Sequence, residues 1–332
     1  MEKVAFRYLT QEEVMGLGIS DNEIIDVVEG ALASHGKKFV ENPPKPGIHT
    51  RHMTFIHAMP AWIKDKDVCG IKWVCGYPEN YKYNLPQIAG LLILNDPETG
   101  MPIALMDCRW ITAVRTAAVT AVTAKYCVRQ DAEVVTIIGA GVQGKMNAKM
   151  LQKVVPNLKL VQVYDIKEQV MQTYIEQMSP KLRIEVKGIN NLEKAVKESD
   201  VVLTATQKLE NPIVRSEWLK PGVMGFGLES SRAWHGNALL AMDKFITDDW
   251  EQTKYYQSHN GAFVDGLPKL YAQLGEVVIG EKPGRENDSE KIMAINHGMA
   301  LIDMALADEI YRRAMAKDVG IDLTLMEQDN LI

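Results

Sequence analysis

The residues from Thr136 to Met150, TIIGAGVQGKMNAKM, constrain the fold of this chain more than any other stretch. An apolar run rich in β-branched residues ends at three glycines, and a helical pattern begins directly after them. Downstream, runs typical of strands go on alternating with runs typical of helices. This alternation requires parallel strands joined by helical crossovers, so the sequence predicts an α/β domain over residues 129–299.

The three glycines have the spacing G-x-G-x-x-G between a strand and a helix. Gly139 allows a tight turn, Gly141 leaves room for a pyrophosphate against the backbone, and Gly144 lets helix and strand approach closely. The phosphates would lie at the helix N-terminus, where unpaired N–H groups attract negative charge. Asp165 ends the next strand, 21 residues after Gly144, where a carboxylate accepts ribose hydroxyls and repels a 2′-phosphate. The pattern predicts a Rossmann domain that binds NAD rather than NADP.

The first part of the chain has a different pattern. Four runs typical of strands follow one another without helices between them, which indicates an antiparallel or mixed sheet. They are residues 53–63, 68–77, 88–96 and 102–108. A serine-capped helix precedes them at residues 20–39, and an amphipathic helix at residues 297–320 is expected to pack back onto this part. We therefore predict a mixed α+β domain of residues 1–128 plus 300–332, into which the α/β domain is inserted.

Composition argues against several classes of function. The formal net charge is −6 with acidic and basic residues interspersed, which gives no basic surface for nucleic acid or a membrane. No apolar run reaches the roughly 18 to 20 residues that span a bilayer. The four cysteines lack CxxC spacing and no apolar signal segment is found, which favours a cytoplasmic protein with reduced thiols. No residues stand at metal-ligand spacing, so no metal is expected.

Two basic residues stand in apolar surroundings in the first domain. Lys72 lies within the run GIKWV, where an ammonium is costly unless it has an anionic partner. Arg115 interrupts an otherwise apolar helix pattern in the same way. Either residue alone is typical of a structural ion pair. Together, in a domain that adjoins a dinucleotide-binding domain, they indicate a clamp for a substrate carboxylate.

Five motifs, in their order and spacing, resemble the ornithine cyclodeaminase/mu-crystallin family. They are Met59-Pro60, GIKWV with Lys72, RTAA at 115–118, GAGVQG, and Gly275-Glu276. The resemblance covers the chain from about residue 40 to residue 315. It implies a homodimer whose sheet-rich domain, built from both chain ends, carries the substrate site and the subunit contact, while a Rossmann domain carries NAD(P).

The resemblance also implies roles for single residues. Lys72 and Arg115 hold the substrate carboxylate, and Glu229, where the cyclodeaminases carry an aspartate, performs acid/base chemistry at the substrate amine. His57 stands where the cyclodeaminases carry a glutamate, which changes the charge balance; its alternative role is that of a hydrogen-bonded strand histidine. The positions that contact the cofactor in this family, besides the glycines and Asp165, are Gln87, Val142, Gln143, Thr206 and His297.

The implied activity is NAD(H)-dependent chemistry at the Cα–N bond of a small amino or imino acid. The leading specific hypothesis is ornithine cyclodeaminase, which converts L-ornithine to L-proline and ammonia without net consumption of NAD. His57 weakens it, because the distal ammonium of a diamine favours more than one carboxylate in a closed pocket. An alanine-dehydrogenase-like enzyme and a cyclic imine or ketimine reductase would use the same residues. A non-catalytic, crystallin-like NAD(P)-binding protein is the alternative of another class.

Overall fold

The computed structural model describes residues 3–207, 209–259 and 262–327, and the chain divides into two compact units. Unit 1 comprises residues 1–115 and 299–332, and unit 2 comprises residues 116–298. The first division therefore falls at residues 115/116, whereas the sequence pattern placed it at 128/129. The difference lies within helix α3 (Arg109–Cys127), which is continuous and contributes residues to both units. No helix among the described residues is long and apolar enough to cross a membrane.

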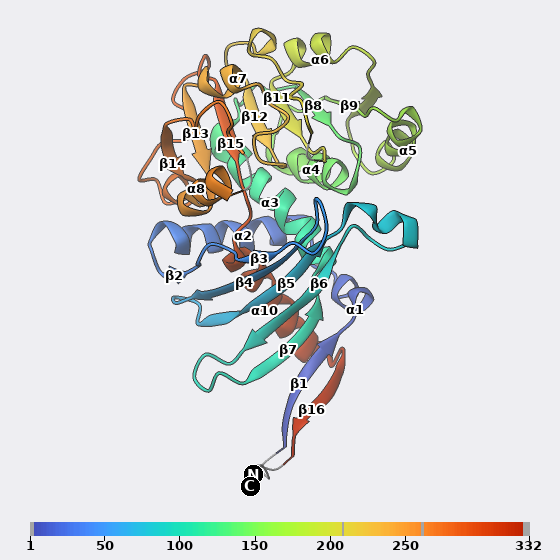
Figure 1. Ribbon diagram of the computed structural model, residues 1–332, viewed down its shortest axis with the longest axis vertical. Coiled ribbons are helices and arrows are strands. Elements are labelled where there is room, and N and C mark those ends of the chain that lie inside the picture. The colour runs from blue at the N-terminus through green and yellow to red at the C-terminus, as the bar shows by residue number, and fades with distance from the viewer. Residues whose placement is uncertain (1–2, 208, 260–261, 328–332) are drawn as a thin grey trace. The chain divides into compact units, whose positions relative to one another are not determined.

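Unit 1 is built on an eight-stranded mixed sheet (Figure 1). Its strands are β1 (Val4–Leu9), β2 (Val40–Glu41), β3 (Gly47–Ile48), β4 (Phe55–Ile63), β5 (Val68–Gly76), β6 (Ile88–Asn95), β7 (Pro102–Asp107) and β16 (Ile321–Met326). They lie in the order β16-β1-β7-β6-β5-β4-β2, with β3 paired to β4. Only the β1–β7 pair is parallel. The predicted antiparallel or mixed sheet is confirmed, while β1, β2, β3 and β16 were not predicted.

Unit 1 also contains helices that pack against the sheet or against one another. They are α1 (Gln11–Gly16), α2 (Asp21–Gly36) and α10 (Ala300–Lys317), with a 3₁₀ helix η1 at Pro78–Tyr83. Ser20 caps α2 through a capping box with Glu23, and the buried residues of α2 repeat at helical spacing. Helix α10 packs against α2 and against strands β4, β5 and β6 (Figure 1). The predicted return of the C-terminal helix onto the first domain is confirmed.

Unit 2 is built on eight strands that all pair in parallel. The strands are β8 (Val134–Ile138), β9 (Leu160–Tyr164), β10 (Glu185–Gly188), β11 (Val201–Thr204), β12 (Met224–Gly227), β13 (Lys244–Thr247), β14 (Leu270–Gln273) and β15 (Ile292–Ile295). The helices that follow α3 are α4 (Val142–Val154), α5 (Glu168–Met178), α6 (Leu192–Glu198), η2 (Ser216–Trp218), α7 (Gly236–Leu240), α8 (Trp250–His259) and α9 (Leu274–Val278). This confirms the predicted α/β class.

The strand order of unit 2 locates its ligand edge. The order is β10-β9-β8-β11-β12-β15-β13-β14, so the chain winds outward from β8 in one direction and from β11 in the other. In sheets of this type ligands bind beyond the carboxyl ends of the strands at that reversal. The loops after β8 and β11 are therefore the first place to look for a site.

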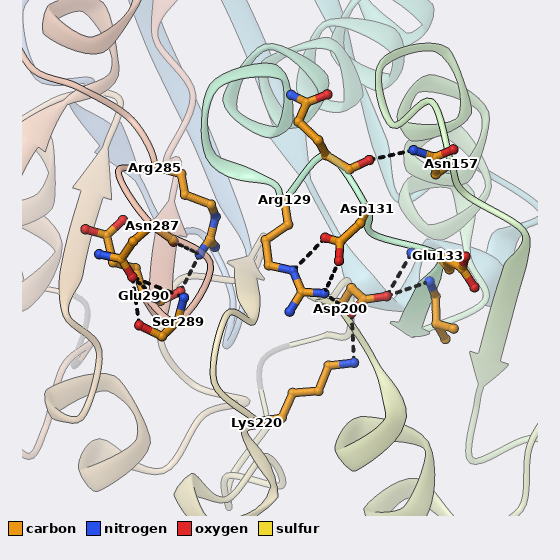
Figure 2. A network of polar contacts seen from close by, with 12 residues as sticks. Arg129, Asp131, Glu133, Asn157, Asp200, Lys220, Arg285, Asn287, Ser289 and Glu290 are labelled. Carbon is orange, nitrogen blue, oxygen red and sulfur yellow. Dashed lines mark hydrogen bonds and ion pairs between the residues drawn. The ribbon is translucent and has the colours of Figure 1, made fainter.

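The opposite ends of three neighbouring strands are joined by a polar network around Asp200 (Figure 2). The Asp200 carboxylate accepts the backbone N–H groups of Glu133 and Val134, at 2.8 and 3.0 Å. It also forms ion pairs with Lys220 at 2.8 Å and with Arg129 at 3.7 Å. Burial opposes ionisation of Asp200, but Lys220 and the two N–H groups outweigh it and lower its pKa. One carboxylate thus ties together the starts of β8, β11 and β12.

We expect Asp200→Asn to lower the free energy of unfolding by about 1–3 kcal/mol, because the new NH₂ group faces either the backbone donors or the Lys220 ammonium. Asp131→Asn is the matched control: Asp131 pairs with the same Arg129, but its side chain is 72% exposed, and we expect a clearly smaller loss of stability. Urea unfolding followed by circular dichroism measures both. Since the folded-state pKa of Asp200 is lowered, its contribution is present at neutral pH and is lost as the pH falls through that pKa. Equal losses in the two variants would contradict this account.

Candidate functional site

The glycine loop after β8 has two glycines fixed by packing and one that faces open space. Gly139 has φ +111°, and a Cβ there would lie 2.5 Å from the Ala205 carbonyl oxygen, in the loop after β11. A Cβ on Gly144 would collide with the Gly139 carbonyl oxygen, so α4 packs against the turn only with glycine at that position. A Cβ on Gly141 meets no atom within 4 Å. The N-terminus of α4, which Gly141 caps, therefore begins beside unfilled space.

Asp165 lies against this loop. Its Oδ2 accepts the backbone N–H of Ala140 at 3.0 Å, and its Oδ1 accepts that of Lys167 at 3.0 Å. Thr206 follows β11, and its backbone nitrogen would be 3.1 Å from a Cβ on Gly139. The structure thus brings Asp165 and Thr206 to the same loop from two different strands. Val142 and Gln143 form the first turn of α4, and Val142 is 55% exposed.

His297 lies at the end of β15 in unit 2, and Asp248 holds its backbone. The Asp248 carboxylate accepts the N–H groups of His297 at 2.9 Å and of Gly298 at 2.6 Å. The His297 ring stacks on Tyr256 with centroids 4.6 Å apart and an interplanar angle of 28°. The carboxyl ends of β13 and β15 are therefore joined, and the imidazole has a defined orientation.

Unit 1 contains a buried cluster of three charges around Asp303. Strand β5 carries Lys72, whose Nζ lies 2.6 Å from Asp303 Oδ2, and both side chains are 0% exposed. Helix α3 carries Arg115, whose Nε lies 3.2 Å from Asp303 Oδ1. Asp303 itself lies in the first turn of α10, where the helix dipole favours a carboxylate. The structure thus brings together the two cations that the sequence singled out.

The charge of this cluster is not balanced. Two cations share one carboxylate, which leaves a net positive charge in a buried place. Burial lowers the pKa of Lys72 to about 8; Asp303 opposes this shift and Arg115 adds to it. A further anion would relieve the repulsion between the two cations, and a carboxylate suits arginine and lysine as a hydrogen-bond partner. A carboxylate bound beside Lys72 and Arg115 would neutralise the cluster.

Sequence reasoning required an anionic partner for Lys72 but did not name Asp303. The signal was present, because Asp303 is the single charged residue in the otherwise apolar run MALIDMALA. Its distance of 231 residues from Lys72 along the chain hid the pairing. A single carboxylate on a buried helix face requires a partner of opposite charge, as does a single ammonium in a buried strand.

Glu229, which follows β12 in unit 2, is a further buried ionisable group. The Oε1 of Glu229 accepts a hydrogen bond from Thr204 Oγ1 at 2.8 Å. Burial raises the pKa of Glu229 to about 8, although Thr204 and nearby backbone N–H groups favour the ionised form. Glu229 is therefore largely protonated at neutral pH and can both give and take a proton within the physiological range.

His57 and Gln87 lie outside these clusters. In the register of β4 against β5, Met59 lies opposite Lys72 and His57 lies opposite Val74. Since His57 and Met59 are two residues apart on β4, His57 lies on the same face of the sheet as Lys72. Its ring stacks on Phe55 with centroids 4.3 Å apart. Gln87 is exposed just before β6.

A parallel sheet with this strand order, a glycine loop at its reversal and an acid after the next strand define a dinucleotide-binding α/β protein. The chain belongs to the ornithine cyclodeaminase/mu-crystallin family, whose model matches residues 5–318. It is 34% identical over 315 residues to the nodulation efficiency protein NfeD of Rhizobium meliloti, covering 95% of this chain and 97% of that protein.

Two solved structures resemble the whole chain. One is the Δ1-pyrroline-2-carboxylate reductase of Thermococcus litoralis in complex with NADH and L-proline, with a TM-score of 0.87, 30% identity, and 96% of this chain and 100% of that chain covered. The other is an archaeal alanine dehydrogenase dimer with bound NAD, with a TM-score of 0.86, 30% identity, and 97% and 100% covered.

The two kinds of glycine in the loop should respond differently to a methyl group. We expect Gly144→Ala to lower the free energy of unfolding by about 1–3 kcal/mol, because its Cβ overlaps backbone that cannot move without separating α4 from β8. Gly141→Ala should change it by no more than about 1 kcal/mol, since its φ of −77° suits alanine and the space is open. Chemical unfolding of the whole protein measures the free energy of unfolding of both variants. A larger loss in Gly141→Ala would mean that the open space is not there.

Proposed function

We propose that this chain is an NAD(H)-dependent oxidoreductase that interconverts a small α-amino acid and its imino acid. The observation that carries the proposal is the buried Lys72–Asp303–Arg115 cluster, in which two cations share one carboxylate, in a chain that also holds a dinucleotide-binding loop. An α-carboxylate is the group that such a cluster would bind. L-proline and alanine, named for the two similar structures, both carry one.

The residues present fit NAD. Open space at Gly141 leaves room for a pyrophosphate at the α4 N-terminus, and Asp165 offers a carboxylate to the ribose hydroxyls. Bound NAD supplies the hydride acceptor in oxidation, and NADH supplies the donor in reduction. The carboxylate of Asp165 also disfavours a 2′-phosphate, which agrees with NAD over NADP.

The chain's own residues then have separate tasks. Lys72 and Arg115 bind and orient the substrate carboxylate, with Asp303 holding both cations in place. Glu229 exchanges a proton with the substrate nitrogen: its ionised form takes a proton from the amine in oxidation, and its protonated form gives one in reduction. A pKa near 8 keeps both forms available around neutral pH.

The second candidate is cyclodeamination, which family membership favours. It needs the same carboxylate clamp and proton exchange, and in addition a place for the distal amine of a diamino acid. His57 on the face of Lys72 offers an imidazole where the resemblance led us to look for a carboxylate. We therefore place the dehydrogenase or reductase activity first and ornithine cyclodeaminase second. A non-catalytic binding protein is less consistent with two buried ionisable side chains, Lys72 and Glu229, whose pKa values are both shifted to about 8.

We also propose that the chain forms a homodimer through the sheet of unit 1. The sheet face opposite α10 exposes Trp73 and Leu91, which are directly paired and 47% and 44% exposed. An apolar sheet face left uncovered is typical of an interface. The similar alanine dehydrogenase is described as a dimer. All four cysteines are free, which suits a reducing compartment, and we propose the cytoplasm as the location.

A substrate panel tests the proposed activity. The protein is incubated with NAD and L-alanine, L-proline and L-ornithine in turn, while NADH absorbance and ammonia are followed; NADH with the corresponding imino acids tests the reverse reaction. We expect net formation or consumption of NADH with at least one pair. Ammonia without net NADH would identify a cyclodeaminase instead, and cofactor binding without turnover of any substrate would contradict both activities.

The variants for the same panel separate the assigned roles. Lys72→Met should raise KM by about tenfold or more with a smaller change in kcat, because it removes a charge-assisted hydrogen bond to the carboxylate. Glu229→Gln should lower kcat by roughly 100-fold or more and spare NADH affinity. Gly141→Ala should weaken NADH binding and change kcat less than Glu229→Gln does.

The oligomeric state tests the apolar face. We expect Trp73→Glu to shift the protein from dimer to monomer in sedimentation velocity, because it places a charge in the centre of the proposed interface. Leu240→Glu is the control, since Leu240 is 56% exposed on α7 in unit 2 and lies outside that face. A wild-type monomer, or a dimer unaffected by Trp73→Glu, would overturn the proposed interface.

A further inference from the structure

The hydroxyl of Thr204 lies at a junction of three groups in unit 2. Thr204 ends β11 and is 0% exposed. Trp234 donates its indole N–H to Thr204 Oγ1 at 3.0 Å. The same oxygen lies 2.8 Å from Glu229 Oε1 and 3.2 Å from the Phe226 carbonyl oxygen. Every one of these contacts is inside unit 2.

With Glu229 ionised, the available protons fix the direction of each hydrogen bond at Thr204. An indole N–H can only donate and a carbonyl can only accept, while a hydroxyl has one proton to give. Because Trp234 donates to Thr204, the single Thr204 proton goes either to Glu229 Oε1 or to Phe226 O. The carboxyl oxygen is both the nearer acceptor and, when ionised, the stronger one. When Glu229 is ionised, Thr204 therefore donates to Oε1.

The other carboxyl oxygen is left for chemistry. Glu229 Oε2 is buried and accepts no hydrogen bond of good geometry among the residues that the structure describes, although the backbone N–H groups of Ala233 and Thr206 lie near the carboxyl. An oxygen that already receives a hydrogen bond is the weaker place for a proton, so the exchangeable proton belongs on Oε2. A buried polar oxygen without a partner costs free energy, and such a cost is kept where a ligand supplies the partner.

We propose that Thr204 and Trp234 form a relay of two hydrogen bonds that fixes the Glu229 carboxyl and directs its exchangeable proton to Oε2. Thr204 is a positioning residue in this scheme, since it acts through Glu229, and Trp234 positions Thr204. The role of Glu229 in proton exchange rests on the proposed function. The two hydrogen bonds and their effect on the Glu229 pKa do not.

Few charged side chains lie on the elements around Glu229, so the hydrogen bond from Thr204 should have a measurable effect on the Glu229 pKa. Strands β11, β12 and β15 carry no titratable side chain. The segment 228–235 contributes Arg232 and His235 besides Glu229. Burial is the largest cause of the raised pKa, and the Thr204 hydrogen bond is the largest influence that opposes it.

Removing the hydroxyl gives the test. In Thr204→Val the shape is kept and the donor to the ionised carboxylate is lost, so the Glu229 pKa should rise by about 1–2 pH units. Thr204→Ser keeps the donor and should titrate like the wild type. Trp234→Phe removes the bond that polarises the hydroxyl and should raise the pKa by less. Thr247→Val, a buried threonine at the end of β13 that bonds Ile295 O and Thr253, is the matched control and should leave the titration unchanged.

The measurement is an infrared pH titration of the Glu229 carboxyl band, assigned by its loss in Glu229→Gln, on the intact protein without substrate. An unshifted titration in Thr204→Val overturns the proposal; if that variant does not fold, an unshifted titration in Trp234→Phe overturns it. A shifted pKa in a protein that turns over no amino or imino acid supports the relay and counts against the proposed function alone. In an active protein, Thr204→Val should move the pH dependence of kcat for oxidation upward by the same amount, with KM largely unchanged.

Discussion

The buried ion pair between Lys72 and Asp303 is the interaction on which the packing of unit 1 depends, because neither charge is stable there without the other. Neither side chain is exposed, and either charge alone at that depth would cost several kcal/mol. The strand that carries Lys72 and the helix that carries Asp303 come from opposite ends of the chain, so the pair joins β5 to α10. A pair of apolar residues would hold the same packing at less cost. The charges therefore agree with the substrate-binding role that we propose, and Arg115 lies beside the second carboxylate oxygen of Asp303.

The local features of this fold were predictable from the sequence, whereas most long-range pairings were not, the return of α10 onto unit 1 being an exception. The glycine loop, the capped helix α2 and the four strands β4 to β7 follow from patterns within about ten residues. Strands β1 and β16 form only by pairing with each other and with β7, across nearly the whole chain. The position of β15 between β12 and β13 depends in the same way on contacts that no local pattern encodes.

The candidate site divides along the same line. Lys72 and Arg115 were visible because each is a charge in an apolar pattern, and Asp303 carried the same signal on α10 without a local reason to connect it to them. Thr204 and Trp234 carried no signal at all, since a threonine at the end of a strand and a tryptophan in a loop are ordinary. Their meaning comes from the direction of two hydrogen bonds, which only the folded chain defines.

Burial acts in opposite directions on the two ionisable groups assigned to the substrate. It disfavours the charged form of each, so it lowers the pKa of Lys72 and raises that of Glu229, and both come to about 8. A bound carboxylate would add an anion beside Lys72 and raise its pKa again, which links substrate binding to uptake of a proton when the pH is above that value. The same fold thus shifts the pKa values of an ammonium and of a carboxyl from opposite sides toward neutral pH.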